Sequence, residues 1–383
     1  MSDILIEEST LQSIASAIRN KNGLSNTYKV SEMATAINAI PSGDGFTIDD
    51  VALKNISEIN GTTSFIMSRA FYSYPSLTTA SFSNCKSIDA HAFYYCTSLT
   101  TISFPACINI EMNAFASCTS LTTASFPACT SFGYYAFASC TSLTAISFPV
   151  CTIIGSYAFQ FCSALTTVSF PSCTSIGSYA FSSCTSLTTA SFSACTSIGS
   201  YAFRDCTSLT TANFSVCTST AFGMFYNCSR LTTVSFPLCT RIVNQTFVNC
   251  FGLISVYFPS CTWINPYAFS LCYNLTSVNF PVCKTIDSSA FYSCSSLTEA
   301  YFPLCQTIGN SAFQGCRNLI SLYLTNISSV TTLSGSRVFT STPIGGYSDI
   351  AGQYGSVYVP ASLYNSFLTA TYWSSISARI VSV

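Results

Sequence analysis

The chain has 383 residues, of which only 7% are charged, and its formal net charge at pH 7 is −1. So sparse and balanced a charge excludes the electrostatic footprint of a nucleic-acid or anionic-membrane binder, and we expect neither partner. No run of 18 apolar residues occurs, so we also expect no membrane insertion. Residues 1–8 lack the basic and apolar regions of a secretory signal, which argues against the general secretory route.

Residues 1–43 predict a helical attachment or oligomerisation module. Apolar residues recur at helical spacing in two short segments, with Asn22 and Gly23 at the turn between them and Ser31 as the N-cap of the second. Two helices this short bury too little surface to be stable alone, so we expect them to pack on a partner or on copies of themselves. The residues expected to make this contact are Leu11, Ile14, Ile18, Met33 and Ile37.

The two segments read Leu11-x-x-Ile14-Ala15-x-Ala17-Ile18-Arg19-x-Lys21-x-Gly23 and Glu32-Met33-Ala34-x-Ala36-Ile37. This pattern resembles an N-terminal module of phage tail and prophage-encoded structural proteins. The resemblance implies contacts with other tail or virion proteins and a homo-oligomer, with trimers common among fibre proteins of this organisation.

Residues 44–65 predict an N-terminal capping coil. They lack the register of the segment that follows, but they carry five branched apolar residues: Ile48, Val51, Leu53, Ile56 and Ile59. An uncovered end coil would be an aggregation-prone edge, so a repeat array needs such a segment.

Residues 66–325 contain twelve copies of a 22-residue unit without insertion or deletion. A Phe column runs from Phe71 to Phe313 and a Leu column from Leu77 to Leu319, both in steps of 22 residues. Within a unit, alternation predicts a strand with Ile102 facing inward. Stacked units would place these strands in one parallel sheet, with about 4.8 Å between coils. The predicted fold class is therefore a leucine-rich-repeat solenoid with a parallel β-sheet on one face.

One unit reads Leu165-Thr166-Thr167-Val168-Ser169-Phe170-Pro171, followed by Ile176-Gly177-Ser178-Tyr179-Ala180-Phe181-Ser182-Ser183-Cys184. This unit resembles the BspA-like bacterial leucine-rich repeats, and the resemblance covers roughly residues 65–325. It implies the repeat solenoid and a bacterial cell-surface adhesin. The units are one residue shorter than the common form, and residues 220–225 depart from its pattern, which predicts a local kink or a shifted loop there.

The 22 cysteines form two columns of eleven, one from Cys85 to Cys305 and the other from Cys96 to Cys316. Neighbouring cysteines are always eleven residues apart, so the close pairs typical of zinc sites are missing. Disulfides between stacked coils are geometrically possible, but small buried reduced thiols are the favoured interpretation. The single histidine, His91, occupies a column otherwise rich in tyrosine. We expect no metal, no cofactor and no catalytic site.

The outward positions of the strands change along the chain. Early units are monotonous, as in Thr101 with Ser103, whereas later units carry Tyr, Asn and Glu, which offer stacking area and directional hydrogen bonds. The predicted ligand-binding residues are Ser255, Tyr257, Ser277, Asn279, Glu299, Tyr301, Ser321 and Tyr323. The alternative is that the units near the end of the array have drifted, because tyrosine is a good strand residue.

Residues 326–383 predict a C-terminal cap. Residues 356–359 alternate as a short strand, and Pro360 begins a helix expected to run to about Thr371. Trp373 and Ile376 are expected to close the last coil.

We interpret the chain as a non-enzymatic phage or prophage tail protein, a fibre or receptor-binding protein in the virion. Its solenoid would bind a host-surface glycan or protein. The first alternative is a BspA-like adhesin on a bacterial surface, and the second is an intracellular scaffold for protein partners.

Overall fold

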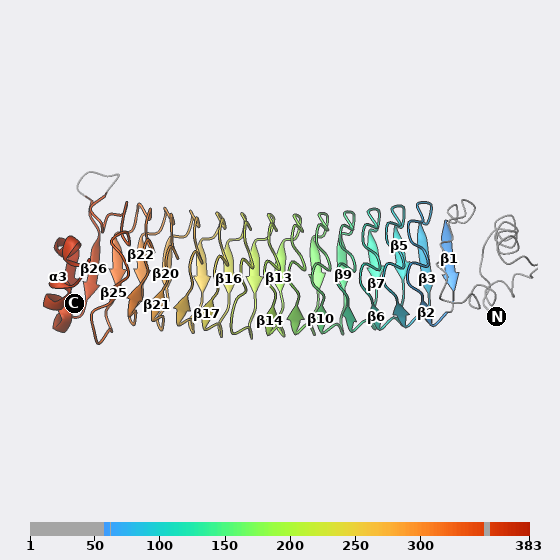
Figure 1. The fold of residues 1–383 in the computed structure, drawn as a ribbon, viewed down its shortest axis with the longest axis horizontal. Coiled ribbons are helices and arrows are strands. Elements are labelled where there is room, and N and C mark those ends of the chain that lie inside the picture. The colour runs from blue at the N-terminus through green and yellow to red at the C-terminus, as the bar shows by residue number, and fades with distance from the viewer. Residues whose placement is uncertain (1–56, 62, 348–352) are drawn as a thin grey trace, which may run out of the picture.

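The computed structural model describes residues 57–61, 63–347 and 353–383, and these form a nearly straight β-solenoid (Figure 1). Each regular coil spans 22 residues and contributes one longer and one shorter strand. The predicted helical module at residues 1–43, with its contact residues, lies outside the described residues. So do Ile48, Val51, Leu53 and Ile56 of the predicted capping coil, whereas Ile59 lies on the first strand and packs partly buried against the core.

The longer strands form one wall of the tube, here called the strand face. The paired neighbours are parallel and in register, as in Thr101 opposite Thr123, and the pairing is interrupted at two places. The strand face comprises β1 (Glu58–Gly61), β3 (Thr79–Phe82), β5 (Thr101–Ser103), β7 (Thr123–Ser125), β9 (Ala145–Ser147), β11 (Thr167–Ser169), β13 (Thr189–Ser191), β15 (Thr211–Asn213), β16 (Thr233–Ser235), β18 (Ser255–Tyr257), β20 (Ser277–Asn279), β22 (Glu299–Tyr301), β24 (Ser321–Tyr323), β26 (Ser356–Val359) and β27 (Ile380–Ser382).

A second parallel wall, here called the second strand column, is built from strands of only two residues. The sequence did not predict it, because one inward apolar residue a unit is too short a pattern to show alternation. It comprises β2 (Phe65–Ile66), β4 (Ser87–Ile88), β6 (Asn109–Ile110), β8 (Ser131–Phe132), β10 (Ile153–Ile154), β12 (Ser175–Ile176), β14 (Ser197–Ile198), β17 (Arg241–Ile242), β19 (Trp263–Ile264), β21 (Thr285–Ile286), β23 (Thr307–Ile308) and β25 (Thr332–Leu333). Between β14 and β17, only a single bridge from Ser219 to Arg241 forms, in the unit whose pattern departs from the others.

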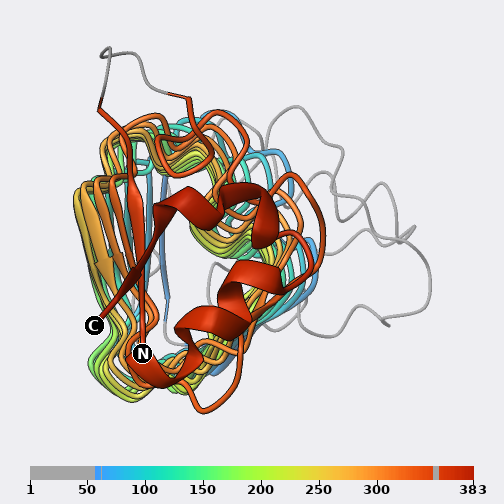
Figure 2. The same ribbon diagram turned by 90° about the vertical axis from the view of Figure 1, so that its left-hand side faces the viewer.

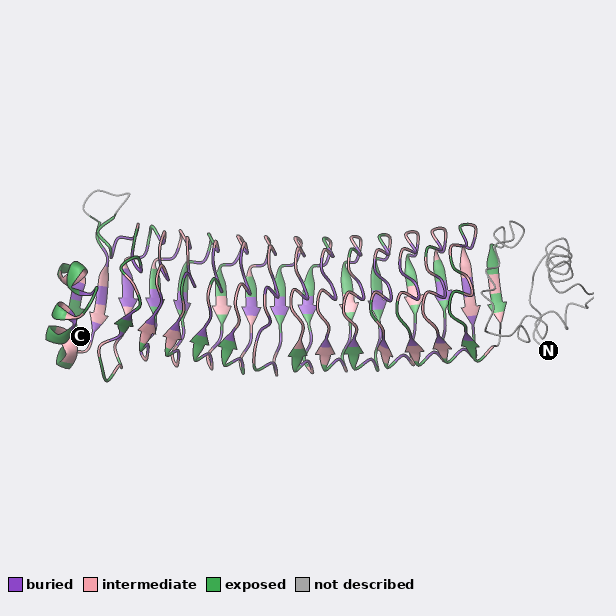
Figure 3. Ribbon diagram, viewed as in Figure 1, coloured by how far each residue is buried: buried purple, intermediate pink, exposed green. Residues whose placement is uncertain are grey.

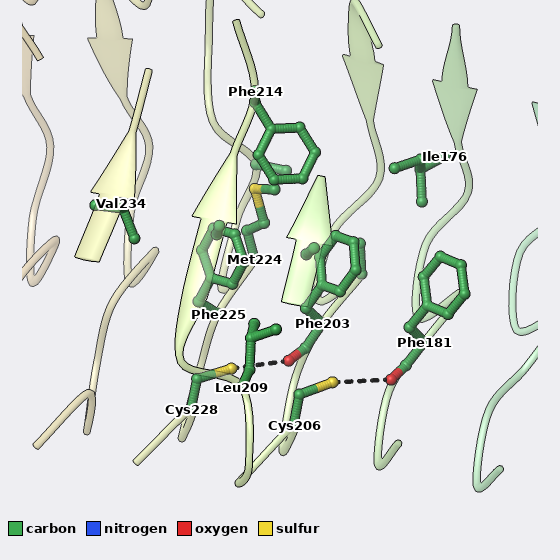
Figure 4. Close-up of a cluster of buried hydrophobic side chains, with 14 of the residues drawn as sticks. Ile176, Phe181, Phe203, Cys206, Leu209, Phe214, Met224, Phe225, Cys228 and Val234 are labelled. Atoms are coloured by element: carbon green, nitrogen blue, oxygen red, sulfur yellow. Dashed lines mark hydrogen bonds between the residues drawn. The ribbon is translucent and has the colours of Figure 1, made fainter. Parts of the chain in front are cut away.

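The core is a pair of phenylalanine ladders. The ring centroids of Phe93 and Phe115 lie 5.0 Å apart, and those of Phe115 and Phe137 lie 5.2 Å apart, with the rings nearly parallel. A second ladder follows the ends of the longer strands, where Phe104 and Phe126 stack at 5.5 Å. The predicted stacking of identical units is therefore confirmed, and Figure 4 shows part of both ladders. Figure 3 shows the matching alternation of buried and exposed residues along the strands.

All 22 cysteines are buried and free. Each thiol donates a hydrogen bond to a backbone carbonyl, which the sequence did not predict. In one column the acceptor lies 25 residues back, on the preceding coil, as in Cys206 to Phe181 at 3.1 Å (Figure 4). In the other column the acceptor lies two residues ahead, as in Cys107 to Asn109 at 3.3 Å. The cysteines therefore satisfy carbonyls at the turns as well as filling space.

The turns on the third side of the tube use left-handed backbone at two positions of nearly every coil, mostly without glycine. One position carries the tyrosine column that was noted around His91. Tyr135, Tyr157, Tyr179 and Tyr201 stack there, with centroids 4.6 to 5.0 Å apart. The row ends at Gly223, where an added Cβ would collide with the Tyr201 ring.

The solenoid continues past residue 325 at altered spacing. Thr332 pairs with Thr307, 25 residues back, and Phe339 stacks on Phe313 at 6.1 Å. Inserted residues change the 22-residue step, which is why the register is lost in the sequence after Leu324. Strand β26 then adds to the strand face beside β24, with Tyr358 opposite Tyr323.

The C-terminal residues lie across the end of the tube (Figure 2). They form η2 (Ala361–Leu363), α3 (Tyr364–Thr369) and η3 (Ser374–Arg379), so the α-helix is shorter than the predicted segment. Trp373 is fully buried, and its Nε1 donates a hydrogen bond to the carbonyl of Thr331 at 2.6 Å. Ile376 packs against the core but stays partly exposed.

Candidate binding surface on the strand face

The outward residues of the strand face differ between its two halves. From β3 to β13 they are Thr, Ser and one Ala, short side chains that leave the wall smooth. From β15 onward the column that contains Ser81 becomes Asn213, Ser235, Tyr257, Asn279, Tyr301, Tyr323 and Tyr358. The large polar side chains are thus concentrated in the C-terminal half.

The strand face divides at two places: between β11 and β13, where the rings of Phe170 and Phe192 lie 6.2 Å apart, and between β18 and β20. At the second place the rings of Phe258 and Phe280 lie 6.2 Å apart, against 5.2 Å for Phe236 and Phe258 on the preceding step. On the turn side of the same coils, Phe269 and Phe291 keep a spacing of 5.1 Å. The coils therefore open on the strand side alone, and this opening separates the predicted ligand-binding residues into two groups.

The first group is Ser255 and Tyr257 on β18. Tyr257 is 58% exposed and stands at the edge of a shallow hollow of about 480 Å³. The outward side chains around the hollow are hydroxyls, the Asn213 amide and the Tyr257 ring, which suit a partner that forms hydrogen bonds and packs against the tyrosine. The other lining residues of the hollow are Thr211, Ala212, Asn213, Thr233, Val234, Ser235 and Val256. None of these residues was predicted from the sequence, although the change from Ser to Asn at position 213 was an available signal.

The second group lies on β20, β22 and β24. Ser277, Asn279, Glu299 and Tyr301 are exposed, but Ser321 is only 8% exposed, so it offers little to a ligand. Ser321 is flanked by paired strands on both sides, β22 and β26.

The tyrosines of this second group form a row that runs to the end of the strand face. The ring of Tyr323 lies 5.8 Å from that of Tyr301 and 4.7 Å from that of Tyr358. The sequence analysis missed Tyr358, because it is 35 residues from Tyr323 rather than 22.

His91 shows no catalytic arrangement. Asn113 donates a hydrogen bond from Nδ2 to His91 Nε2 at 3.2 Å, and the Tyr94 ring lies edge-on at 5.5 Å. Partial burial and then the nearby Arg69 lower the pKa of His91, which keeps the ring neutral at pH 7. Among the described residues, no three His, Cys, Asp or Glu side chains are grouped to hold a metal ion. No helix in the described ranges is long and apolar enough to cross a membrane.

The repeats match a known family. The model described as "BspA type Leucine rich repeat region" matches in six copies, over residues 48–144, 130–251 and 218–344. Together these matches span residues 48–344, well over half of the chain. A search of curated proteins finds no match.

Solved structures of bacterial leucine-rich-repeat proteins are similar to the chain. A leucine-rich repeat protein from Bacteroides ovatus is 24% identical, with 73% of this chain and 94% of that chain covered and a TM-score of 0.42. A leucine rich cell surface protein from Faecalibacterium prausnitzii is 21% identical, with 73% and 91% covered and a TM-score of 0.41. The pneumococcal vaccine antigen PcpA is 17% identical, with 86% and 88% covered and a TM-score of 0.41.

Proposed function

Because this chain belongs to the BspA-type leucine-rich-repeat family, we propose that it is a binding protein whose strand face contacts a molecule on a cell surface. The observation that carries the proposal is the change of outward residues along one unchanged core. A wall of Thr and Ser becomes, from β15 onward, a wall with exposed Tyr257, Asn279 and Tyr301. Side chains that do not serve the core are free to serve a ligand.

The chemistry of this surface favours a partner held by short-range contacts. Tyrosine gives large contact area at low cost in conformational entropy, and it is enriched at the centres of protein interfaces. The hollow beside Tyr257 is shallow, and the tyrosine row beyond it continues over three neighbouring strands. A broad, gently contoured surface of this kind suits a protein, and an extended glycan strand is the second ligand class.

We propose that the solenoid is carried on a phage or prophage tail, where residues 1–43 attach it to other virion proteins and assemble copies of the chain. The support is the resemblance of that segment to tail-protein modules. Contacts through Leu11, Ile14, Ile18, Met33 and Ile37 would hold the oligomer together. The alternative is a bacterial surface adhesin, favoured by the family that the repeats match.

Binding is tested with purified full-length protein and a panel of intact bacterial cells and cell-wall preparations. We expect the protein to sediment with at least one of them. We also expect the triple variant Tyr257→Ser, Tyr301→Ser, Tyr323→Ser to reduce that binding at least tenfold, since interface tyrosines often contribute more than about 1.4 kcal/mol each.

A matched control replaces three exposed tyrosines on the turn side: Tyr95, Tyr134 and Tyr267, which are 48%, 58% and 46% exposed. This triple variant loses similar exposed area but should bind as the wild type does. Equal binding by the strand-face variant would refute the site. A wild-type protein indifferent to every envelope preparation would refute a cell-surface function altogether.

The site of assembly is tested by immunogold electron microscopy with an antibody against the solenoid. Labelled tails on particles released by lysis would support the virion proposal. Label confined to the bacterial envelope would instead support the adhesin.

A further inference from the structure

A second group of exposed side chains lies on the second strand column, away from the strand face. Its centre is Trp263 on β19, which is 42% exposed, whereas the other tryptophan, Trp373, is fully buried. Most residues at this position of the repeat are Ser, Thr or Asn, from Ser87 to Thr307. An exposed indole there serves neither the core nor the ladder of backbone hydrogen bonds, so its position calls for another explanation.

Trp263 is held by charged groups on both neighbouring coils. The Cζ atom of Arg241, one coil before, lies 4.5 Å from the centroid of the indole. On the coil after, Asp287 accepts a hydrogen bond from Nε1 at 2.6 Å between Nε1 and Oδ2. A cation over the ring and a carboxylate on its N–H fix the orientation of the side chain.

Two asparagines hold the side chain of Arg241 in place. Its Nε donates a hydrogen bond to Oδ1 of Asn265 at 3.2 Å, and Nδ2 of Asn265 donates to Oδ1 of Asn244 at 2.9 Å. Asn265 is only 3% exposed, so this support belongs to the body of the solenoid. A chain of contacts from Asn244 to Asp287 therefore holds one solvent-facing indole in place, which is the arrangement expected of a preorganised binding site.

The indole of Trp263 is 42% exposed, so part of its surface faces solvent. Arg241 covers the face toward the N-terminal coils. On the other side the paired residue is Thr285, whose side chain ends at its γ atoms and is too short to cover an indole. The coil that follows Trp263 offers the hydroxyl of Thr285, the carboxylate of Asp287 and, next to Thr285 in the sequence, the exposed ammonium of Lys284.

We propose that Trp263 and the polar groups around it form a glycan-binding site, in which a pyranose ring stacks on the exposed surface of the indole. The apolar C–H face of a pyranose needs a flat aromatic surface, and its hydroxyls need donors and acceptors at the rim. Asp287 accepts from sugar hydroxyls, and Thr285 and Lys284 donate to them. This site goes beyond the strand-face proposal and does not depend on it.

The local charges favour a sugar over the other ligands that stack on tryptophan. Asp287 would attract a quaternary ammonium ligand, but Arg241 already lies over the ring, with its Cζ 4.5 Å from the centroid, and opposes a second cation there. A nucleic-acid strand needs a basic groove along its backbone, but the net charge of the chain is −1. A neutral pyranose meets neither obstacle.

The test uses the full-length protein on an array of immobilised oligosaccharides with neutral, N-acetylated and acidic pyranoses, together with single-stranded oligonucleotides and a choline-bearing surface. We expect retention on at least one class of oligosaccharide and a loss of at least tenfold in affinity for Trp263→Ala. Trp263→Phe should retain part of the affinity, because it keeps an aromatic face.

The matched control is Ile153→Ala, at the same repeat position five units away. Ile153 is apolar and 50% exposed, so its loss removes comparable surface without touching the site. The control should bind as the wild type does. The triple tyrosine variant of the strand face should also keep its glycan binding, so the two proposals fail separately.

Three outcomes would overturn the proposal. The first is a wild type that retains no oligosaccharide, and the second is a Trp263→Ala variant that binds as tightly as the wild type while unfolding at the same denaturant concentration. The third is retention of the oligonucleotide or the choline surface in preference to every glycan.

Discussion

The N-terminal and C-terminal halves of the solenoid share one core but carry different walls. Phe115 and Phe137 stack at 5.2 Å in the first half, and Phe291 and Phe313 stack at 5.3 Å in the second. Outside, β5 presents Thr101 and Ser103, whereas β22 presents Glu299 and Tyr301. In a strand that alternates inward and outward residues, the two sets are independent, so the wall can change without cost to the core. The outward positions of the strand face are therefore the ones that can change to suit a ligand while the core stays the same.

The largest expected effect concerns the buried cysteines, and it tests whether their thiols are protected equally in both halves. Burial raises the pKa of Cys107, in the first half, and of Cys305, in the second, to about 12. An unfolded thiol ionises near pH 8.5, so the unfolded chain binds fewer protons above that pH than the folded chain does. Stability is therefore fully present below about pH 8.5 and is lost as the pH rises toward 12. Each such thiol contributes about 1.4 kcal/mol per pH unit to this loss.

Many buried thiols act together, so we expect the urea midpoint to fall steeply between pH 8 and pH 10. Thiol labelling checks the same point: at pH 8 the folded protein should resist a thiol reagent, and unfolding should expose all 22 cysteines. A midpoint that stays constant over this pH range, or rapid labelling of the native protein, would contradict the buried ladders in both halves.

The next effect tests whether the phenylalanine core stabilises the two halves equally. Phe115→Ala and Phe291→Ala each remove a fully buried ring that stacks on two neighbours. We expect each to cost about 3–5 kcal/mol, and the two losses to agree within about 1 kcal/mol. Denaturant unfolding measures both. Losses that differ by more than this would show that the packing of the halves is not the same.

A smaller effect concerns the left-handed turns. Ser117 and Ser293 belong to one column and have φ values of 62° and 57°, and Gly315 already occupies this column one coil after Ser293, with φ 78°. We expect Ser117→Gly and Ser293→Gly to stabilise the protein by about 0.5–1 kcal/mol each, because glycine adopts this backbone without strain. Ser103→Gly, on an extended strand, is the control and should destabilise by about 0.5–1 kcal/mol. Stabilisation by the control, or destabilisation by both turn variants, would contradict the explanation.

Much of the fold could be predicted because the same apolar residues recur at the same positions in every unit. The columns of Phe71 and Leu77 fixed the stacking, and alternation around Ile102 fixed the strand face. The second strand column could not be predicted, since a two-residue strand such as Ser87–Ile88 carries no periodic signal. The left-handed turns were not predicted either, because most residues in the Ser117 column are Ser, Tyr, Phe or Leu, which do not favour positive φ, and only four are Asn, Asp or Gly.

The candidate sites were only partly predictable. Tyr257 and Tyr301 broke a monotonous column and were found for that reason. The opening between β18 and β20 was not found, because the residues on both sides follow the repeat. Trp263 was missed because it interrupts a column that only the structure identifies as a strand. A residue that departs from the repeat can be recognised only when its column is known, and for Trp263 only the structure identifies that column.

The smallest expected effect tests the independence of core and wall directly. Ser125 and Tyr257 occupy the same outward position on strands 132 residues, or six units, apart. We expect Ser125→Tyr and Tyr257→Ser to change the free energy of unfolding by no more than about 0.5 kcal/mol, because both positions are exposed and neither side chain enters the core. A loss near 2 kcal/mol in either variant, measured by the same denaturant series as the core variants, would mean that the tyrosine helps to hold the coils together. In that case the change of wall along the solenoid would be a structural device, and the argument that these tyrosines are available for a ligand would fail.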